Sequence, residues 1–163
     1  MTQIGDAAQA LLALLVVEFN KPGQNGNFCS AAVMPGSDVP YDYGQEACGG
    51  SLWVRLTTAN PSAAFPAADT TVDNCAVTLA YPFEVGVMRP APLAEMIGDE
   101  LVLPTEEENT AAALQQLKDL ETMYRTLVMF GDQVEALLPG IYTPIGPEGG
   151  VVGGKWTFTM GLI

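Results

Sequence analysis

The chain has 163 residues, 48% of them hydrophobic, which fits a single domain over residues 1–163 with one buried core. Nineteen Asp and Glu residues stand against six Lys and Arg residues, so the formal net charge is −13. Because affinity for nucleic acid comes largely from cations that neutralise phosphates, this balance excludes a protein that holds DNA or RNA tightly.

An apolar segment near the start predicts a first helix from about Gln3 to Phe19, which Pro22 and Gly23 end. The run at 7–17 is too short to span a bilayer and follows Asp6 rather than basic residues, so we expect a buried helix and not a membrane or targeting segment. One stripe of this helix contains Ile4, Ala8, Leu11, Leu12, Leu15 and Phe19. Apolar residues beside the stripe need cover from the core of the same chain or from a neighbouring subunit.

The segment 22–50 is rich in Gly and Pro and predicts a long loop with one short strand around Phe28 to Met34. A loop of this length inside a domain usually binds a partner. The three cysteines are Cys29, Cys48 and Cys75, and their spacing matches no zinc or redox motif. We therefore expect free thiols, buried as small apolar residues, rather than a disulfide.

Alternating residues predict a strand at 51–59, and a second loop follows at 60–74. The clearest period-two pattern spans 75–89, where one face carries Val77, Leu79, Tyr81, Phe83, Val85 and Val87. Pro82 cannot donate to a ladder, so we expect this strand at a sheet edge or bent by a bulge. The two strands are expected to form an antiparallel pair.

A Pro-rich break at 89–92 precedes a second helix, predicted over 106–130 with Gly131 at its end. Thr105 and Glu108 mark its start as a capping box. The face expected to meet the core carries Ala113, Leu117, Leu120, Tyr124, Leu127 and Val128. The opposite face carries Gln115, Lys118, Asp119 and Thr122.

The Gly-rich segment 140–154 predicts a loop with a flexible hairpin turn at 149–154, and a last strand follows at 155–160. The order of elements predicts an α+β fold: a small antiparallel sheet with the N-terminal helix and the long late helix packed on one face, long loops and a C-terminal strand. Trp53 and Trp156 are expected to stack across strands as part of the core.

Groups that could carry catalysis are scarce. The chain has no histidine, the commonest general base and metal ligand, and it has no nucleophile or phosphate-loop motif. Acidic runs at 99–100 and 106–108 lack the spacing of a calcium loop, and a helix N-terminus accounts for the second run. We expect no enzymatic activity, no cofactor and no metal.

Four segments carry a resemblance to a known family. They are CGGSLWVRL at 48–56, FPAADTTVDNCAVTLAYPFEVGVMRPAP at 65–92, AALQQLKDLETMYR at 112–125 and YTPIGPEGGVVGGKWTFTM at 142–160. Together they resemble the small neck and tail-completion proteins of long-tailed phages that infect actinobacteria, most of all the tail terminators. The resemblance covers most of the chain after residue 45 and rests on the order and texture of these segments.

This resemblance implies a non-enzymatic virion protein, assembled in the host cytoplasm, that forms a ring, usually a hexamer. Such a ring caps the tail tube, stops its polymerisation and joins the tail to the head. The implied partners are further copies of the chain, the major tail tube protein and a head-tail connector or stopper protein. DNA would pass through without specific binding, which suits an acidic protein. A different neck component, or a small-molecule binding or enzymatic domain, remain the alternatives.

Ring closure requires heterologous contacts, in which one patch of a subunit meets a different patch of the next. We expect the loops 22–50 and 60–74 and the segment 144–154 to make many of them, unless they fold back on their own subunit. The expected interface residues are Phe28, Val33, Met34, Phe65, Ile145, Val151 and Val152. Replacing the two last with Asp is expected to weaken assembly without unfolding the chain.

Overall fold

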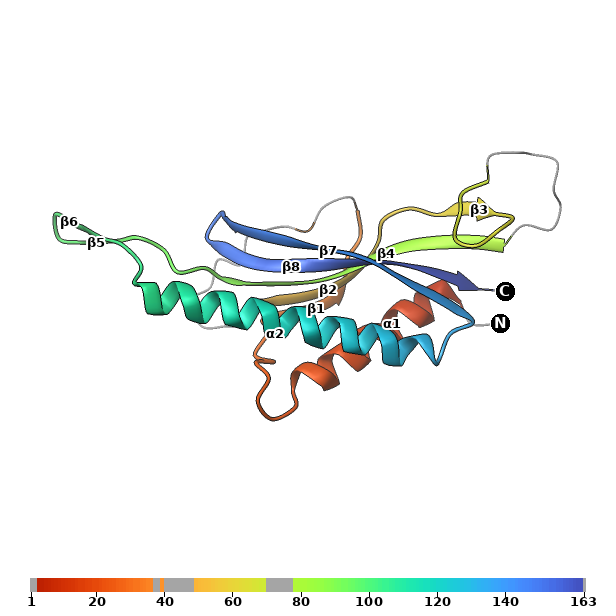
Figure 1. Ribbon diagram of the computed structural model, residues 1–163, viewed down its shortest axis with the longest axis horizontal. Coiled ribbons are helices and arrows are strands. Elements are labelled where there is room, and N and C mark those ends of the chain that lie inside the picture. The colour runs from red at the N-terminus through yellow and green to blue at the C-terminus, as the bar shows by residue number, and fades with distance from the viewer. Residues whose placement is uncertain (1–2, 37–38, 40–48, 70–77, 163) are drawn as a thin grey trace.

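The computed structural model describes residues 3–36, 39, 49–69 and 78–162. Its elements are α1 (Ile4–Phe19), β1 (Ser30–Val33), β2 (Ser51–Leu56), β3 (Asn60–Ser62), β4 (Thr78–Pro90), β5 (Glu95–Ile97), β6 (Glu100–Val102), α2 (Glu106–Gly131), β7 (Ala136–Glu148) and β8 (Val151–Leu162). Six strands form one sheet, and β5 with β6 forms a separate hairpin that projects from one end of the molecule (Figure 1). The fold is α+β, as predicted.

The main sheet has the order β1-β2-β4-β8-β7, and β3 pairs with β4 past the end of β2. The predicted antiparallel pair is confirmed as β2 and β4, although β2 already ends at Leu56. The prediction of a purely antiparallel sheet is wrong for one pair, because β1 runs parallel to β2. A parallel pair needs a crossover of about a dozen residues or more, and the segment 34–50 supplies it.

Pro82 lies in the middle of the sheet, not at its edge. Its strand, β4, pairs with β8 in unbroken register from Leu79 to Pro90, so the expected edge or bulge is wrong. The carbonyl of Pro82 points to the β2 side, where it accepts from the Thr57 backbone N–H at 2.9 Å. On that side Pro82 lies between the last pair of β2 and the first pair of β3, so no strand residue pairs with it there. The missing N–H of proline therefore costs no ladder hydrogen bond.

Most of the Gly-rich segment 140–154 belongs to the β7–β8 hairpin, so its prediction as a loop is wrong. Only Gly149 and Gly150 form the turn, with φ of 59° and 79°, values that suit a two-residue hairpin turn. β7 is an edge strand, so its outer side faces no neighbouring strand. A proline such as Pro144 can lie there without the loss of a ladder hydrogen bond on that side. The last strand is therefore longer than the predicted 155–160.

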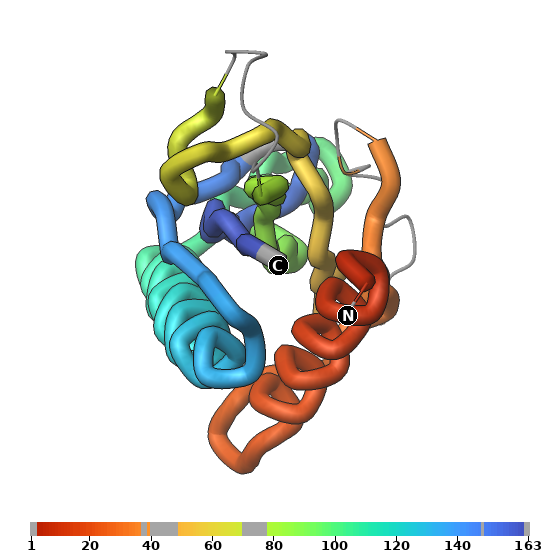
Figure 2. Tube along the Cα trace, turned by 90° about the vertical axis from the view of Figure 1, so that its right-hand side faces the viewer, coloured from red at the N-terminus to blue at the C-terminus, as the bar shows by residue number. Residues whose placement is uncertain are grey.

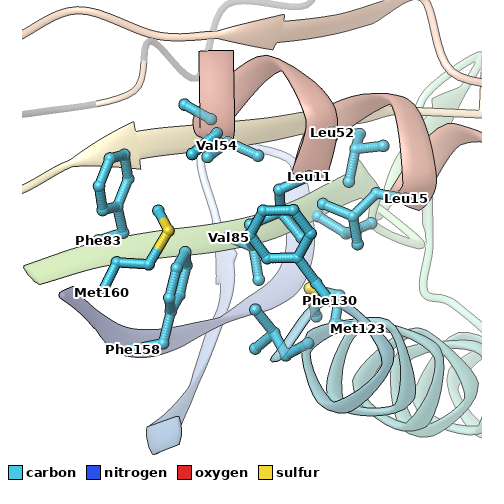
Figure 3. Packing of buried hydrophobic residues seen from close by; sticks show 14 of the residues in the cluster. Leu11, Leu15, Leu52, Val54, Phe83, Val85, Met123, Phe130, Phe158 and Met160 are labelled. Atoms are coloured by element: carbon cyan, nitrogen blue, oxygen red, sulfur yellow. The ribbon is translucent and has the colours of Figure 1, made fainter. Parts of the chain in front are cut away.

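Both helices pack on one face of the sheet, as predicted, and Figure 2 shows them on the same side of the strands. The first helix presents the predicted stripe to the core. In Figure 3, Leu11 and Leu15 of α1 and Met123 and Phe130 of α2 converge on Val85 of β4. The core is thus a layer between one sheet face and two helices, which holds α2 along the length of the sheet.

The helix α2 is rotated relative to the sequence prediction. Its buried residues are Asp119, Thr122, Met123, Thr126, Leu127 and Phe130. Of the residues expected in the core, Leu127 is buried and Leu120 half-buried, whereas Ala113, Leu117, Tyr124 and Val128 are exposed. The prediction of this face is therefore largely wrong, and the side that meets the sheet is mixed, with three polar and three apolar buried residues.

Polar partners on the sheet account for this rotation. The Trp156 indole N–H donates to the Leu120 carbonyl at 3.1 Å, and the Gln116 amide donates to the Gly153 carbonyl. Asp119 pairs with Arg89 of β4. Because a buried polar group without a partner costs more than an exposed leucine, these bonds decide which side of α2 turns inward.

Trp53 and Trp156 do not stack on each other, so that prediction is wrong. Trp53 is buried on the sheet face opposite the helices, in a second cluster with Val39, Met88 and Val151. Trp156 packs on the helix side, with its ring centre 5.1 Å from that of Tyr124 and 5.6 Å from that of Tyr142.

Cys29 is disulfide-bonded and exposed, so the expectation of free, buried thiols is wrong for this residue. Cys48 and Cys75 lie outside the described residues. Among the described residues, no helix combines the length and the apolar character that crossing a membrane requires.

The capping box at the start of α2 is confirmed. The Glu108 backbone N–H donates to the Thr105 hydroxyl at 3.2 Å, and the Glu108 carboxylate accepts from the Thr105 backbone N–H at 2.8 Å. The carboxylate also accepts from the Thr105 hydroxyl at 3.0 Å, and the two bonds that it accepts, from the backbone N–H first, lower the pKa of Glu108 from its ordinary value of 4.5. A lowered pKa stabilises the fold above the ordinary value, and the effect is lost as the pH falls through the folded pKa.

Replacing Thr105 with alanine is therefore expected to lower the free energy of unfolding by about 1 kcal/mol at neutral pH. The difference from the unmodified chain should shrink as the pH falls below 4.5. Urea denaturation at several pH values measures both effects. Thr110→Ala in the same helix is the control, because alanine is the better helix former there and no cap is removed. Equal losses in the two variants would contradict the capping role.

Candidate functional site

The segment between β4 and α2 forms a projecting arm, which we define as residues 93–103. Met96, Ile97 and Leu103 are 64%, 63% and 67% exposed, although all three are large apolar side chains. The arm also carries exposed Leu93, Leu101 and Val102. In Figure 1 it extends beyond the start of α2, at the far end of the molecule from the C-terminal end of β8. Such a concentration of exposed apolar residues marks an interaction surface.

Local sequence explains why the arm forms a hairpin. Gly98, with φ of 66°, makes the turn, and Met96 lies directly opposite Leu101 across the ladder. Side chains alternate along a strand, so Met96 and Leu101 share one apolar face, and Glu95, Ile97, Glu100 and Val102 lie on the other. A lone two-stranded hairpin is marginally stable in water. The arm therefore needs cover that the described chain does not supply.

The outward side of α2 carries a second exposed apolar surface, the α2 stripe, made of Leu114, Leu117, Tyr124 and Val128. These side chains are between 45% and 55% exposed. Together with Glu121, which lies between Leu117 and Tyr124, they follow one another at alternating intervals of three and four residues. This spacing is typical of a helix that packs lengthwise against a partner. Three of its four residues, Leu117, Tyr124 and Val128, were expected to face the core.

Two basic residues flank the α2 stripe. Lys118 and Arg125 are seven residues apart, so they lie on the same side of the helix. Lys118 makes no ion pair with any described residue, and Arg125 reaches Glu18 only at 3.8 Å with a side chain that is 54% exposed. Both cations are thus accessible beside the stripe.

Other cations are held inside the fold. Arg89 donates to Asp119 at 2.6 and 2.8 Å, and it also donates to the carbonyls of Gly49 and Asn25. Its guanidinium carbon lies 4.8 Å from the centre of the Phe28 ring. This cluster fastens the end of β4 to α2 and to the segments around both carbonyls.

A second buried ionic cluster lies on the sheet face opposite the helices. Glu84 accepts from Arg55 at 2.7 Å, from the Trp53 indole at 3.3 Å and from Lys155 at 3.0 Å. Arg55 also donates to the Gly36 carbonyl at 3.2 Å. The carboxylate is thus neutralised by two cations, which makes the cluster structural in character.

Two small cavities were considered as ligand sites. One, of about 290 Å³, lies at the base of the arm and is lined by apolar residues with Glu95 and Glu108. The other, of about 210 Å³, lies beside Arg89 and Gln115. Four of the five N–H groups of Arg89 are already bonded within the chain, which leaves little for a ligand.

Among the described residues, no three His, Cys, Asp or Glu side chains come together to hold a metal ion. Burial raises the pKa of Tyr142 above its ordinary value of 10.0, so the phenol stays neutral at physiological pH. Its hydroxyl lies 3.5 Å from the Gly153 carbonyl, and its ring packs on Trp156.

The structure places the predicted interface residues in different surroundings. Phe28 packs edge-on against Phe19, with ring centres 5.2 Å apart, and partly covers the main core. Met34 and Ile145 are half-buried against the second cluster. Val33, at the end of edge strand β1, is 40% exposed and remains available to a partner.

The remaining three predicted residues lie near the sheet. Phe65 is half-buried with its ring beside Gly161. Val151 is buried in the second cluster, so its placement outside the core is wrong. Val152 is half-buried and lines the smaller cavity. The structure does not bring the seven residues together into one surface.

The burial of Val151 changes the expected effect of a polar substitution. Val151→Thr keeps the shape but buries a hydroxyl, so we expect a loss of about 1–3 kcal/mol in the free energy of unfolding. Val152→Thr, at a half-buried position, should cost less. Chemical denaturation of both variants measures the difference. Equal, negligible losses would show that Val151 is not a core residue.

The arm and the α2 stripe were missed by the sequence analysis. The signal for the arm was present, because apolar residues flank the Gly98–Asp99 turn on both sides. The stripe gave a clear helical period but no sign of which side faces out. A scan against models of known protein families found no match, and a search of curated protein sequences found none either.

Proposed function

We propose that this chain is a structural virion protein that forms a ring at the head-proximal end of a phage tail tube. There it stops tube polymerisation and joins the tail to the head connector. The single observation that carries the proposal is the arm, an exposed apolar hairpin that protrudes from the sheet and helices. A surface of this kind requires a protein partner, and it adds to the resemblance of the sequence segments to tail terminators.

The distribution of surfaces fits ring formation. The arm and the α2 stripe are different patches on one chain, and contacts between unlike patches generate rings or filaments rather than closed two-fold dimers. The usual six-fold ring of tail terminators is the expected form.

Charge supports the same role. Four of the six basic side chains, Lys21, Arg55, Arg89 and Lys155, are paired with carboxylates of the same chain. Most of the remaining acidic residues therefore present negative charge to the solvent. A channel with such a lining repels DNA and lets it pass without sticking.

Deleting the reading frame from the phage that encodes it, followed by electron microscopy of the lysate, tests the proposal. A tail terminator predicts tubes of abnormal length, unattached heads and rescue by the gene supplied in trans. Gold-labelled chain should then mark the junction between tail and head. Normal, infectious particles without the protein would overturn the proposal.

The same images separate the terminator from the other neck components. Loss of a stopper or head-completion subunit predicts tails of normal length that lack heads, because tube polymerisation still ends where it should. Overlong tubes therefore identify the terminator, and headless tails of normal length identify a different neck protein.

A further inference from the structure

We infer that the arm of one copy of this chain docks along the α2 stripe of the next copy. The inference rests on the proposed ring and names the contact that builds it. Both surfaces are apolar, and their side chains are 41–67% exposed within the described residues, although the ring of Tyr124 also packs on Trp156. A second copy supplies both halves of the contact without a further protein.

The contact must form between chains because the arm cannot reach its own stripe. Leu103 and Pro104 join the arm directly to Thr105, the cap of α2. The arm is directed past the start of the helix and away from the rest of α2 (Figure 1). Folding it back would require breaking the capping box that fixes this junction.

The dimensions of the two surfaces agree. From Leu114 to Val128 the stripe is about 21 Å long at 1.5 Å per residue. One edge of the arm, from Leu93 to Ile97, is about 13 Å long at 3.3 Å per residue. The arm therefore fits within the stripe, with its face of Met96 and Leu101 toward the helix.

The charges of the two surfaces are complementary. The arm carries Glu95, Asp99 and Glu100 and no basic residue, with Glu95 and Glu100 on the hairpin face opposite Met96 and Leu101. The stripe is flanked by accessible Lys118 and Arg125, about 10.5 Å apart along the helix axis, with Glu121 between them. The opposite net charges attract the arm to the stripe, and the apolar area supplies the strength of the contact.

Two complementary variants test the contact. Met96→Thr/Leu101→Thr removes the apolar face of the arm and keeps strand-forming residues. Leu114→Gln/Leu117→Gln removes the start of the stripe and keeps helix-forming residues. All four side chains are at least 55% exposed, so circular dichroism and thermal melting should match those of the unmodified chain.

Each variant alone is expected to lose the assemblies that the unmodified chain forms in analytical ultracentrifugation. A mixture of the two should form complexes of two chains and nothing larger. One intact arm then meets one intact stripe, and the two remaining surfaces are both defective.

Other outcomes overturn the inference and separate it from the proposed function. A variant that assembles normally, or a mixture that stays monomeric while the unmodified chain assembles, means that the arm has another occupant, such as the tube or connector. The ring itself would stand in that case. An unmodified chain that stays monomeric removes the contact between copies, and the microscopy of the deletion then decides the proposed function independently.

Charge reversal tests the attraction between the two surfaces. Lys118→Glu/Arg125→Glu is expected to weaken self-association about tenfold, and adding Glu95→Lys/Glu100→Lys to the same chain should restore most of it. Asp132→Lys, a charge change beyond the stripe, is the control. A quadruple variant no better than the first pair overturns the proposed attraction between the arm and α2.

Discussion

Replacing Arg89 with methionine is expected to lower the free energy of unfolding by about 3–5 kcal/mol, because Asp119 would stay buried without its cation. The two side chains are only 7% and 2% exposed and lie 2.6 Å apart, so water cannot take the place of the lost partner. The substitution also frees the carbonyls of Asn25 and Gly49, to which Arg89 donates. Urea denaturation followed by circular dichroism measures the loss.

Two further variants give this expectation its controls. Arg125→Met, which removes a half-exposed cation at 3.8 Å from Glu18, should change the stability by no more than about 1 kcal/mol. Arg89→Met/Asp119→Leu should recover part of the loss, since it removes both charges. A cost for Arg89→Met no larger than that for Arg125→Met would show that the buried pair does not hold α2 on the sheet.

The ends of both helices could be predicted from local chemistry. Thr105 and Glu108 satisfy groups that only a helix start leaves open, and Pro22 lies just past the end of α1. The strands β2 and β4 could be predicted as well, because alternation of side chains is a property of the strand itself. Signals of this kind lie within a few residues of one another.

The inward side of α2 could not be predicted because its cause lies far away in the sequence. Asp119 is drawn to the sheet by Arg89, 30 residues earlier, and nothing near Asp119 reveals that partner. The apolar side of the helix has the same period as the polar side. The expectation that the more apolar side faces the core is wrong for four of its six residues, Ala113, Leu117, Tyr124 and Val128.

The β7 strand was missed for a different reason. A central strand would be interrupted by residues such as Pro139, Gly140 and Pro144. The strand β7 lies at the sheet edge, and its register with β8 shifts between Pro139 and Tyr142. An edge strand tolerates residues that bond on one side only. Position in the sheet, which the local sequence does not carry, decides how such residues are interpreted.

Three of the residues expected at an interface lie on the sheet face opposite the helices. Met34 and Ile145 pack against the second cluster, and Val151 is part of it. Large exposed apolar side chains gather on two other elements, the arm and the α2 stripe. Paired strands and helices hold their side chains in fixed relative positions, which suits the repeated contact of the proposed ring.

Replacing Phe158 with alanine is expected to lower the free energy of unfolding by about 3–5 kcal/mol, through the buried area lost and the cavity left. Phe158 is 2% exposed and stacks on Phe83 with ring centres 5.5 Å apart, at the centre of the sheet face that both helices cover (Figure 3). Phe158→Leu removes less volume and should cost less. Denaturation of the two variants measures the difference.

The Phe158 variant also separates folding from assembly. Its side chain touches neither the arm nor the α2 stripe, so the molecules that remain folded should still assemble as the unmodified chain does. The Met96→Thr/Leu101→Thr variant should behave in the opposite way, with stability kept and assembly lost, because its side chains contribute nothing to the core. Loss of assembly in folded Phe158→Ala molecules would mean that the sheet core itself shapes the contact surfaces, and that the arm and stripe are not rigid, independent parts.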